Sequence, residues 1–189
     1  MPPGLRKSGT TVLVGRIVQN LETGGSMSGL ALFTLFHVAL SLVGIAAGFV
    51  VVFGLIGGKK LGVWTPTFVW TTILTSVTGF LFPFKGVTPG IVLGIISLVV
   101  LAFTVYALYM KRLAGGWRST YAVTAVLALY LNFFVLIAQM FMKAPALKAL
   151  APTGTEGPFK VTQLCALILF LVLGVLATRR FRHAELSAA

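Results

Sequence analysis

The stretch that decides the fold is residues 30–56, LALFTLFHVALSLVGIAAGFVVVFGLI, which contains no Asp, Glu, Lys or Arg. A helix needs about 20 mostly apolar residues to cross roughly 30 Å of hydrocarbon. Residues 30–56 are long enough to cross with some tilt. Four more apolar stretches follow, at about 63–84, 88–110, 119–142 and 159–178. The sequence therefore predicts an all-α, polytopic membrane protein, a bundle of five transmembrane helices.

The composition agrees with a membrane protein. Of the 189 residues, 58% are apolar and 10% are charged, whereas a soluble domain carries about 25% charged residues. Fifteen Lys and Arg stand against three acids, and there is no Asp, which excludes paired-carboxylate catalysis and a Mg²⁺ cage. The single cysteine, Cys165, excludes an internal disulfide and any multi-cysteine metal site. The sequence indicates no catalytic residue, no metal and no cofactor.

The second stretch, 63–84, is the least typical span because seven Thr and Ser dilute it. A threonine hydroxyl can bond to a carbonyl one turn back, so such a helix is tolerated in lipid. Pro83 and Pro89 bracket a short turn, which predicts a tight hairpin with the third stretch. In the later connection, residues 146–150 fit either one interfacial helical turn or an irregular loop.

The orientation follows from the basic residues between the spans. Five crossings place the two termini on opposite sides, here named side A for the N-terminus and side B for the C-terminus. The positive-inside rule counts Lys and Arg within about 15–20 residues of a span end, which leaves five on side A against eight on side B. We therefore predict an outer N-terminus, a cytoplasmic C-terminus and contact of the side-B cations with anionic headgroups. These cations are Lys59, Lys60, Lys111, Arg112, Arg118, Arg179, Arg180 and Arg182.

Residues 1–26 are set apart from the transmembrane domain at 27–189. Gly24-Gly25-Ser26 directly precedes Met27, and two glycine codons can spell the purine-rich tract of a bacterial ribosome-binding site. Two interpretations remain open. Either the natural start is Met27 and 1–26 is an upstream extension, or 1–26 is a disordered outer tail. A start at Met27 would remove Arg16 and strengthen the predicted orientation.

The net charge of +12 does not indicate nucleic-acid binding. The basic residues lie in short clusters between apolar runs, such as Lys59-Lys60 and Lys111-Arg112, whereas nucleic-acid binding needs them on one folded face. The expected partners are the lipid bilayer and either a second copy of the chain or another membrane subunit.

Polar residues inside the spans are the default candidates for a site. His37 is the one ionisable side chain well inside a span. At about 1.5 Å per residue, it lies with most of the amides in the half of the bundle near side A. This concentration fits either an outward-opening polar pocket or hydrogen bonds between helices. The candidate binding residues are His37, Ser41, Ser97, Asn132, Gln139 and Gln163.

Two Gly-xxx-Gly pairs mark faces on which helices can approach closely. The first pair shares one face of its helix with His37 and Ser41, at spacings of three and four. A packing face with a histidine bonded across it explains this pattern with fewer assumptions than a binding site. The packing candidates are Gly44, Gly48, Gly90 and Gly94.

Two specific chemistries fit the sequence poorly. Haem ligation by two histidines needs both at one depth, but His183 follows the side-B end of the last span, so only a symmetric dimer can pair two copies of His37. Cys165 and His37 lie in the same half of the bundle, but a lone cysteine on an apolar helix is usually inert.

Five strings of the sequence carry a resemblance. They are HVALSLVGI (37–45), TSVTGFLFPF (75–84), GIISLVV (94–100), ALYLN (128–132) and PALKALAPT (145–153). Together they resemble a group of uncharacterised small bacterial multi-pass inner-membrane proteins, from about Met27 to Phe181. The resemblance implies a location in the bacterial inner membrane, and the group has no activity that can be transferred.

Two functions are weighed on this basis. The leading one is a non-enzymatic scaffold or accessory subunit that acts by helix packing, because the sequence has Gly-xxx-Gly faces and lacks catalytic groups. The alternative is binding or transport of a small apolar or weakly polar solute, such as a quinone, in a polar pocket in the outer half of the bundle. A membrane enzyme with His37 as general base comes third.

Overall fold

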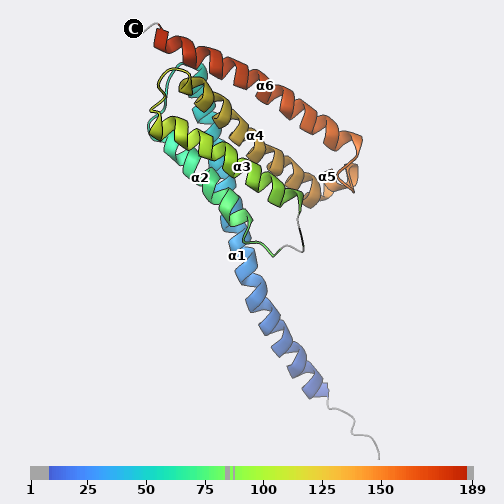
Figure 1. The fold of residues 1–189 in the computed structure, drawn as a ribbon. Helices are drawn as coiled ribbons and strands as arrows, with labels where there is room; N and C mark the ends of the chain where they lie inside the picture. The colour runs from blue at the N-terminus through green and yellow to red at the C-terminus, as the bar shows by residue number, and fades with distance from the viewer. Residues whose placement is uncertain (1–8, 84–85, 87, 187–189) are drawn as a thin grey trace, which may run out of the picture. The chain divides into compact units, whose positions relative to one another are not determined.

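In a computed structural model, the chain is all-helical (Figure 1). The structure describes residues 9–83, 86 and 88–186, and this part of the chain contains no strand. The helices are α1 (Gly9–Ile56), α2 (Trp64–Gly79), α3 (Pro89–Val105) with a π-helical turn at Tyr106–Met110, α4 (Trp117–Lys143), α5 (Pro145–Leu150) and α6 (Gly157–Leu186).

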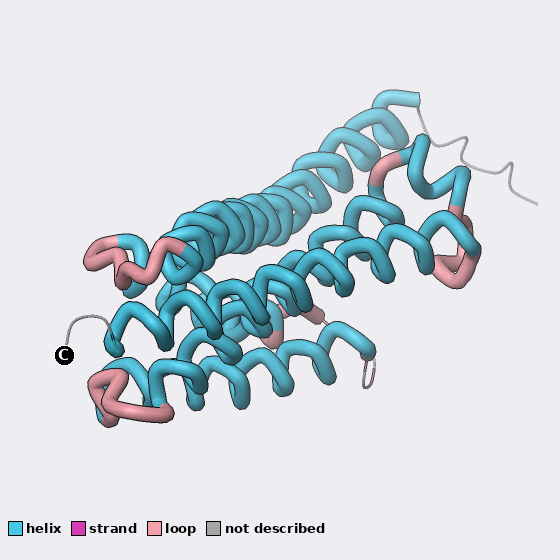
Figure 2. Tube along the Cα trace, turned by 90° about the horizontal axis from the view of Figure 1, so that it is seen from above, coloured by secondary structure: helices cyan, strands magenta, loops and turns pink. Residues whose placement is uncertain are grey.

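The chain divides into two compact units, Met1–Val38 and Ala39–Ala189. The first, the N-terminal unit, holds the beginning of α1. The second, the C-terminal unit, holds the rest of α1 and all the other helices. Short loops join the helices of the C-terminal unit (Figure 2).

The α1 helix runs antiparallel to α2 within the C-terminal unit. Gly44 of α1 lies beside Thr72, and Gly48, one turn later, lies beside Phe68, one turn earlier in α2. Neither glycine has a side chain, so the two backbones approach closely. The direction of the chain reverses in the loop between Ile56 and Trp64.

The α2 and α3 helices form the predicted hairpin. Phe80, directly after α2, lies against Gly94 near the start of α3. Helix α3 begins at Pro89, where a missing N–H costs nothing, and the hydroxyl of Thr88 accepts from the Ile91 backbone N–H at 3.4 Å. Helix α2 ends at Gly79, earlier than the predicted boundary at residue 84. Pro83 explains this end, because it cannot donate the hydrogen bond that would continue the helix.

Helix α4 lies against both α3 and α6. It runs antiparallel to α6, because Phe134 contacts Gln163 early in α6 while Arg118 contacts Phe181 late in α6. One face of α4 is built from small buried residues that let neighbouring helices come close. They are Ala122, Ala125 and Ala128.

Four helical segments among the described residues are long and apolar enough to cross a membrane: Gly29–Ile56, Pro89–Met110, Trp117–Lys143 and Gly157–Arg182. The predicted second span is a helix, but its 16 residues reach only about 24 Å. The structure therefore supports a polytopic membrane protein with four candidate spans. The count of five is not established by helix length.

The structure gives a backbone conformation to two segments for which the sequence left two alternatives open. Residues 146–150 belong to the short helix α5, which is one of the two alternatives. Helix α1 begins at Gly9, so the backbone of residues 9–26 is helical, which differs from the predicted alternative of a disordered outer tail. A long helix extends at little cost once it has formed, which explains the difference. A natural start at Met27 stays a prediction.

Candidate functional site

Ser41 on α1 and Asn132 on α4 are brought together by the fold. The Ser41 hydroxyl donates a hydrogen bond of 2.9 Å to Asn132 Oδ1. Asn132 is only 8% exposed, so its amide needs partners inside the protein. This bond joins two helices through residues that are 91 positions apart in the chain.

Two threonine hydroxyls of α2 complete the surroundings of this bond. A Cβ atom placed on Gly44 would lie 3.1 Å from Thr71 Oγ1, 3.2 Å from Thr72 Oγ1 and 3.4 Å from Asn132 Nδ2. Helices α2 and α4 therefore direct polar atoms toward the bare Cα of Gly44 on α1. We name Ser41, Gly44, Thr71, Thr72 and Asn132 the Asn132 cluster.

The hydrogen-bonding capacity of the Asn132 cluster is only partly used. Thr71 and Thr72 donate their hydroxyl protons to the backbone carbonyls of Thr67 and Phe68, each at 2.7 Å. Their hydroxyl oxygens therefore offer only lone pairs to the cluster. Asn132 Nδ2 is a buried donor with no hydrogen-bond partner among the described residues. The opposite amide orientation would turn Oδ1 toward these lone pairs, which disfavours it.

Gly48 continues the same face of α1 one turn further. A Cβ atom on Gly48 would lie 2.6 Å from Leu129 Cδ1 and 2.9 Å from Phe68 Cε2. Both distances are shorter than a van der Waals contact, so this position has no room for a side chain. The first Gly-xxx-Gly pair is thus used inside the chain, where α1 meets α2 and α4.

The second Gly-xxx-Gly pair is divided between two environments. A Cβ atom on Gly94 would lie 2.8 Å from the ring of Phe80, whereas one on Gly90 would meet nothing closer than Thr88 Oγ1 at 3.7 Å. Gly90 is exposed. Of this second pair, only Gly94 lies at a close approach, to the ring of Phe80 directly after α2.

The remaining amide and hydroxyl candidates do not join the Asn132 cluster. Gln163 Nε2 donates to the backbone carbonyl of Phe134 at 3.1 Å, and its Oε1 is buried with no partner among the described residues. Gln139 is exposed on α4, and Ser97 is buried on α3. Gln163 therefore forms a second, separate contact between α6 and α4.

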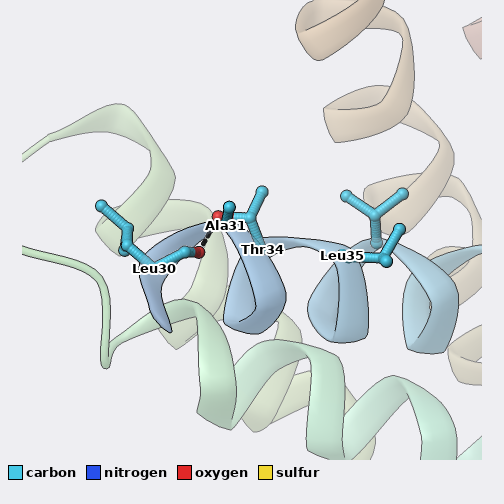
Figure 3. A pocket seen from close by; sticks show the side chains of 5 residues that line it. Leu30, Ala31, Thr34 and Leu35 are labelled. Atoms are coloured by element: carbon cyan, nitrogen blue, oxygen red, sulfur yellow. Dashed lines mark hydrogen bonds between the residues drawn. The ribbon is translucent and has the colours of Figure 1, made fainter. Parts of the chain in front are cut away.

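His37 belongs to the N-terminal unit, where its side chain is partly exposed. In this unit, α1 carries a shallow, open depression lined by Leu30, Ala31, Thr34, Leu35 and Val38 (Figure 3). The Thr34 hydroxyl donates to the Leu30 carbonyl at 2.8 Å. The depression is thus a mostly apolar surface of one helix, and its one hydroxyl, on Thr34, already donates to the backbone.

A pair of buried hydroxyls near side B was not among the sequence candidates. Tyr121 is fully buried, and its hydroxyl lies beside that of Thr65. The geometry does not make a hydrogen bond, and neither oxygen has another partner among the described residues. The sequence held one signal that Thr65 is buried. Thr65 and Thr72 are seven residues apart, which places both on the same face of α2.

Two of the cations near side B, Lys111 and Arg118, lie against aromatic rings. The Lys111 ammonium lies 5.5 Å from the ring centre of Tyr106 and 5.7 Å from that of Trp117. Arg118 Nε donates to the Phe181 carbonyl at 3.2 Å, and the guanidinium lies 4.1 Å from the Phe181 ring centre. Cation–π contacts of this kind fix the charge in place while leaving it positive.

The Glu156 carboxylate organises the loop before α6. It accepts hydrogen bonds from the backbone N–H groups of Thr153 and Thr155 and from the Thr153 hydroxyl, at 2.8–2.9 Å. These bonds favour the charged form and lower the pKa of Glu156 to about 2. Any stability that they add is complete above the ordinary pKa of 4.5 and is lost as the pH falls through about 2.

No group of three or more His, Cys, Asp or Glu in the described residues is placed to hold a metal ion. Cys165 is exposed on α6.

No protein-family model matches the sequence. No match is found among curated proteins or among solved structures either. The resemblance to small bacterial inner-membrane proteins stays a prediction.

Proposed function

We propose that the chain is a bacterial inner-membrane protein that crosses the membrane five times, with α2 as the fifth crossing. Helix α2 runs antiparallel to α1 and forms a hairpin with α3. A membrane-crossing helix between α1 and α3 would have this arrangement. Its outward face carries Trp64, Trp70, Leu74 and Val77, all exposed. An apolar face of this kind is favourable in lipid. Backbone hydrogen bonds continue the turns beyond both ends of α2, because the Thr65 N–H donates to the Leu61 carbonyl at 3.0 Å and the Leu81 N–H donates to the Thr78 carbonyl at 3.1 Å.

The proposed orientation puts side B in the cytoplasm. The loops at this side carry Lys59, Lys60, Lys111 and Arg112, and the end of α6 adds three arginines. The rings of Tyr106 and Trp117 hold Lys111, which fits an interfacial position near anionic headgroups.

Single-cysteine labelling tests both the crossing and the orientation. On a Cys165→Ser background, an impermeant maleimide should label Lys85→Cys and Ala149→Cys in intact spheroplasts. It should label Gly62→Cys and Ala114→Cys only after lysis. Equal labelling of the variants at 62 and 85 would show that α2 does not cross. The reverse pattern at all four positions would invert the orientation.

The function that the geometry supports best is a non-enzymatic scaffold or accessory subunit that acts by helix packing. One observation carries this proposal: Ser41, Asn132 and the Gly44–Gly48 pair join α1 to α2 and α4. Gln163 likewise joins α6 to α4. Small residues and interhelical polar bonds are the means by which helices associate in a bilayer.

A scaffold makes a specific prediction about variants. Rescue of the deletion strain's growth phenotype should follow the amount of folded protein in the membrane, whichever polar residue is changed. Ser41→Ala removes one interhelical bond, which is worth about 0.6 kcal/mol on average, so it should retain nearly full rescue. Growth and membrane abundance are measured together for Ser41→Ala, Gln163→Leu, His37→Leu and His37→Gln.

A binding site or an enzyme would give the opposite pattern. A variant that keeps its abundance and thermal stability but loses rescue would contradict the scaffold. If His37 binds a ligand or moves a proton, His37→Gln should behave in this way. Full rescue by His37→Leu would remove that alternative.

The second candidate is binding or transport of a small solute. Two buried amide atoms that have no hydrogen-bond partner among the described residues, Asn132 Nδ2 and Gln163 Oε1, favour it. Purification from native membranes separates the two functions. A stoichiometric membrane protein retained with the chain supports the scaffold, whereas a stoichiometric small molecule supports the solute.

A further inference from the structure

Two stretches that are far apart in the chain meet at the first turn of α4. The ring centre of Trp117, the first residue of α4, lies 5.7 Å from the ammonium of Lys111 in the loop after α3. Arg118, the next residue, donates from Nε to the Phe181 carbonyl near the end of α6 at 3.2 Å. We name the surface around Lys111, Trp117, Arg118 and Phe181 the α4–α6 junction.

The α4–α6 junction concentrates positive charge at side B. Its cations, here named the junction cations, are Lys111, Arg112, Arg118, Arg179 and Arg182. All of them are exposed except Arg118, which is partly exposed. Side B as a whole carries eight Lys and Arg against a single acid, Glu185. The chain therefore leaves most of this charge for an anionic partner to neutralise.

The loop that carries Lys111 is anchored to the helices around it. The Lys111 ammonium lies within 5.7 Å of the ring centres of both Tyr106 and Trp117. Leu113 is only 8% exposed, and its N–H donates to the Ala107 carbonyl at 3.0 Å. A cation that is already positioned in this way loses less conformational entropy when an anion binds to it.

Two stripes of exposed apolar side chains lead up to the junction. In each stripe the residues are four and then three positions apart, which places them on one face of their helix. The stripe on α3 ends at Tyr106, which contacts Lys111, and the stripe on α6 ends one turn before Arg179. The α3 stripe is Val99, Phe103 and Tyr106, and the α6 stripe is Ile168, Val172 and Val175, all 41–53% exposed.

An amphipathic anion matches this surface better than a soluble one. Inorganic phosphate or a nucleic acid would complement the junction cations but leave the apolar stripes uncovered. A phospholipid complements both, because its phosphate can bind to Arg and Lys while its acyl chains cover apolar helix surface.

We propose that the α4–α6 junction binds the phosphate of an anionic phospholipid, such as phosphatidylglycerol, with the acyl chains against the exposed apolar side chains of the adjoining helices. The proposal rests on the proposed membrane crossing, and it is independent of the scaffold function. It also differs from a general attraction of basic loops to the membrane, because it assigns the headgroup to one place on side B.

Tryptophan fluorescence of the whole protein in mixed micelles tests the proposal. Trp64→Phe and Trp70→Phe leave Trp117 as the only tryptophan, and Trp117 is partly exposed. Phospholipids with brominated acyl chains quench a tryptophan that they contact. We expect phosphatidylglycerol to quench Trp117 at a lower mole fraction than phosphatidylcholine. Equal quenching by the two lipids would overturn the proposal.

Lys111→Gln combined with Arg112→Gln removes two of the junction cations. The preference for phosphatidylglycerol should fall by about fivefold for each lost charge, which is about 1 kcal/mol for each Lys or Arg near an anionic surface. Lys59→Gln combined with Lys60→Gln is the matched control, because it removes the same charge from exposed positions of another loop on side B. The control should keep most of the preference. Equal losses in the two double variants would overturn the proposal, because they would show a diffuse attraction.

A second pair of variants serves if the loop variants fail to fold. Arg179→Gln combined with Arg182→Gln changes two exposed residues of α6, and the unfolding temperature in phosphatidylcholine micelles shows whether each variant is folded. A folded α6 variant should lose the preference for phosphatidylglycerol to the same extent. Full retention of the preference in this variant would contradict a site at the junction.

Excess inorganic phosphate distinguishes a lipid headgroup from a free phosphate. Quenching by brominated phosphatidylglycerol that persists in excess phosphate, compared with sodium chloride of equal ionic strength, supports the lipid. Relief of quenching by phosphate alone would overturn the lipid as the occupant. Cysteine labelling of the loops tests the membrane crossing separately, so an absent lipid preference with the expected labelling pattern would overturn only this site.

Discussion

Replacing Gly48 with alanine is expected to destabilise the protein by about 1–3 kcal/mol, the usual range for overpacking a core. The added Cβ would lie 2.6 Å from Leu129 Cδ1 and 2.9 Å from Phe68 Cε2. Phe68 and Leu129 are themselves fully buried, so they have little space into which to move. Alanine is the better helix former by roughly 1 kcal/mol, and the expected loss is what remains after that gain.

Gly90→Ala is the matched control, because Gly90 belongs to the other Gly-xxx-Gly pair but is exposed. Its added Cβ would meet nothing closer than 3.7 Å, so alanine should be neutral or stabilising there. Unfolding of each variant in mixed detergent micelles measures the free energies. A loss at Gly48 no larger than that at Gly90 would contradict the close contact of α1 with α2 and α4.

These two glycines show what the sequence can and cannot predict about packing. Both stand in the same motif, and the motif correctly indicates that a helix can approach closely. Whether one does so depends on residues far away in the chain. Phe68 and Leu129 lie over Gly48, whereas Gly90 is exposed. No local pattern contains this information.

The helices themselves were largely predictable because apolar length is a local property. The fourth stretch, predicted at 119–142, is helix α4 at Trp117–Lys143. The clearest difference is α2, which ends at Gly79 although its apolar residues continue. The predicted boundary was set by hydropathy. The observed end of the helix is set by backbone hydrogen bonding, because Pro83 lacks the N–H that a longer helix would need.

The candidate site was predictable only in part. Ser41 and Asn132 were both among the candidates, and the structure joins them. Counting residues along each helix placed Thr71 and Thr72 in the other half of the bundle from Asn132, where a threonine that bonds to its own helix needs no partner. The structure instead places both hydroxyls near the Asn132 amide, around Gly44. Their position depends on how α2 is shifted and rotated against α1 and α4, which the sequence does not show.

Replacing Phe170 with alanine is expected to give the other large loss of stability. Phe170 is 3% exposed, and its ring centre lies 5.8 Å from that of Phe49, 5.6 Å from that of Tyr130 and 5.4 Å from that of Phe133. One side chain of α6 thus contacts rings of both α1 and α4. Each aromatic pair contributes about 0.5–1.5 kcal/mol beyond its buried area.

The expected loss for Phe170→Ala is about 2–3 kcal/mol, below the roughly 3–5 kcal/mol typical of water-soluble cores. In a membrane the separated helices remain in an apolar solvent, so the transfer of the side chain from water contributes little. The loss comes from ring contacts and from the cavity left between α6, α1 and α4. Unfolding in mixed micelles measures it, and Phe170→Leu should lose less because it fills part of the cavity.

Phe103→Ala is the control for Phe170→Ala, because it removes the same side chain from an exposed position. Phe103 is on α3 and is 53% exposed, so its replacement should cost less than about 0.5 kcal/mol, as at other exposed positions. Equal losses at Phe103 and Phe170 would contradict the prediction. They would also show that the outer face of α3 is packed in the folded protein, by a second copy of the chain or by another membrane subunit. A scaffold would need such a covered face somewhere on its surface, and this comparison measures whether α3 provides it.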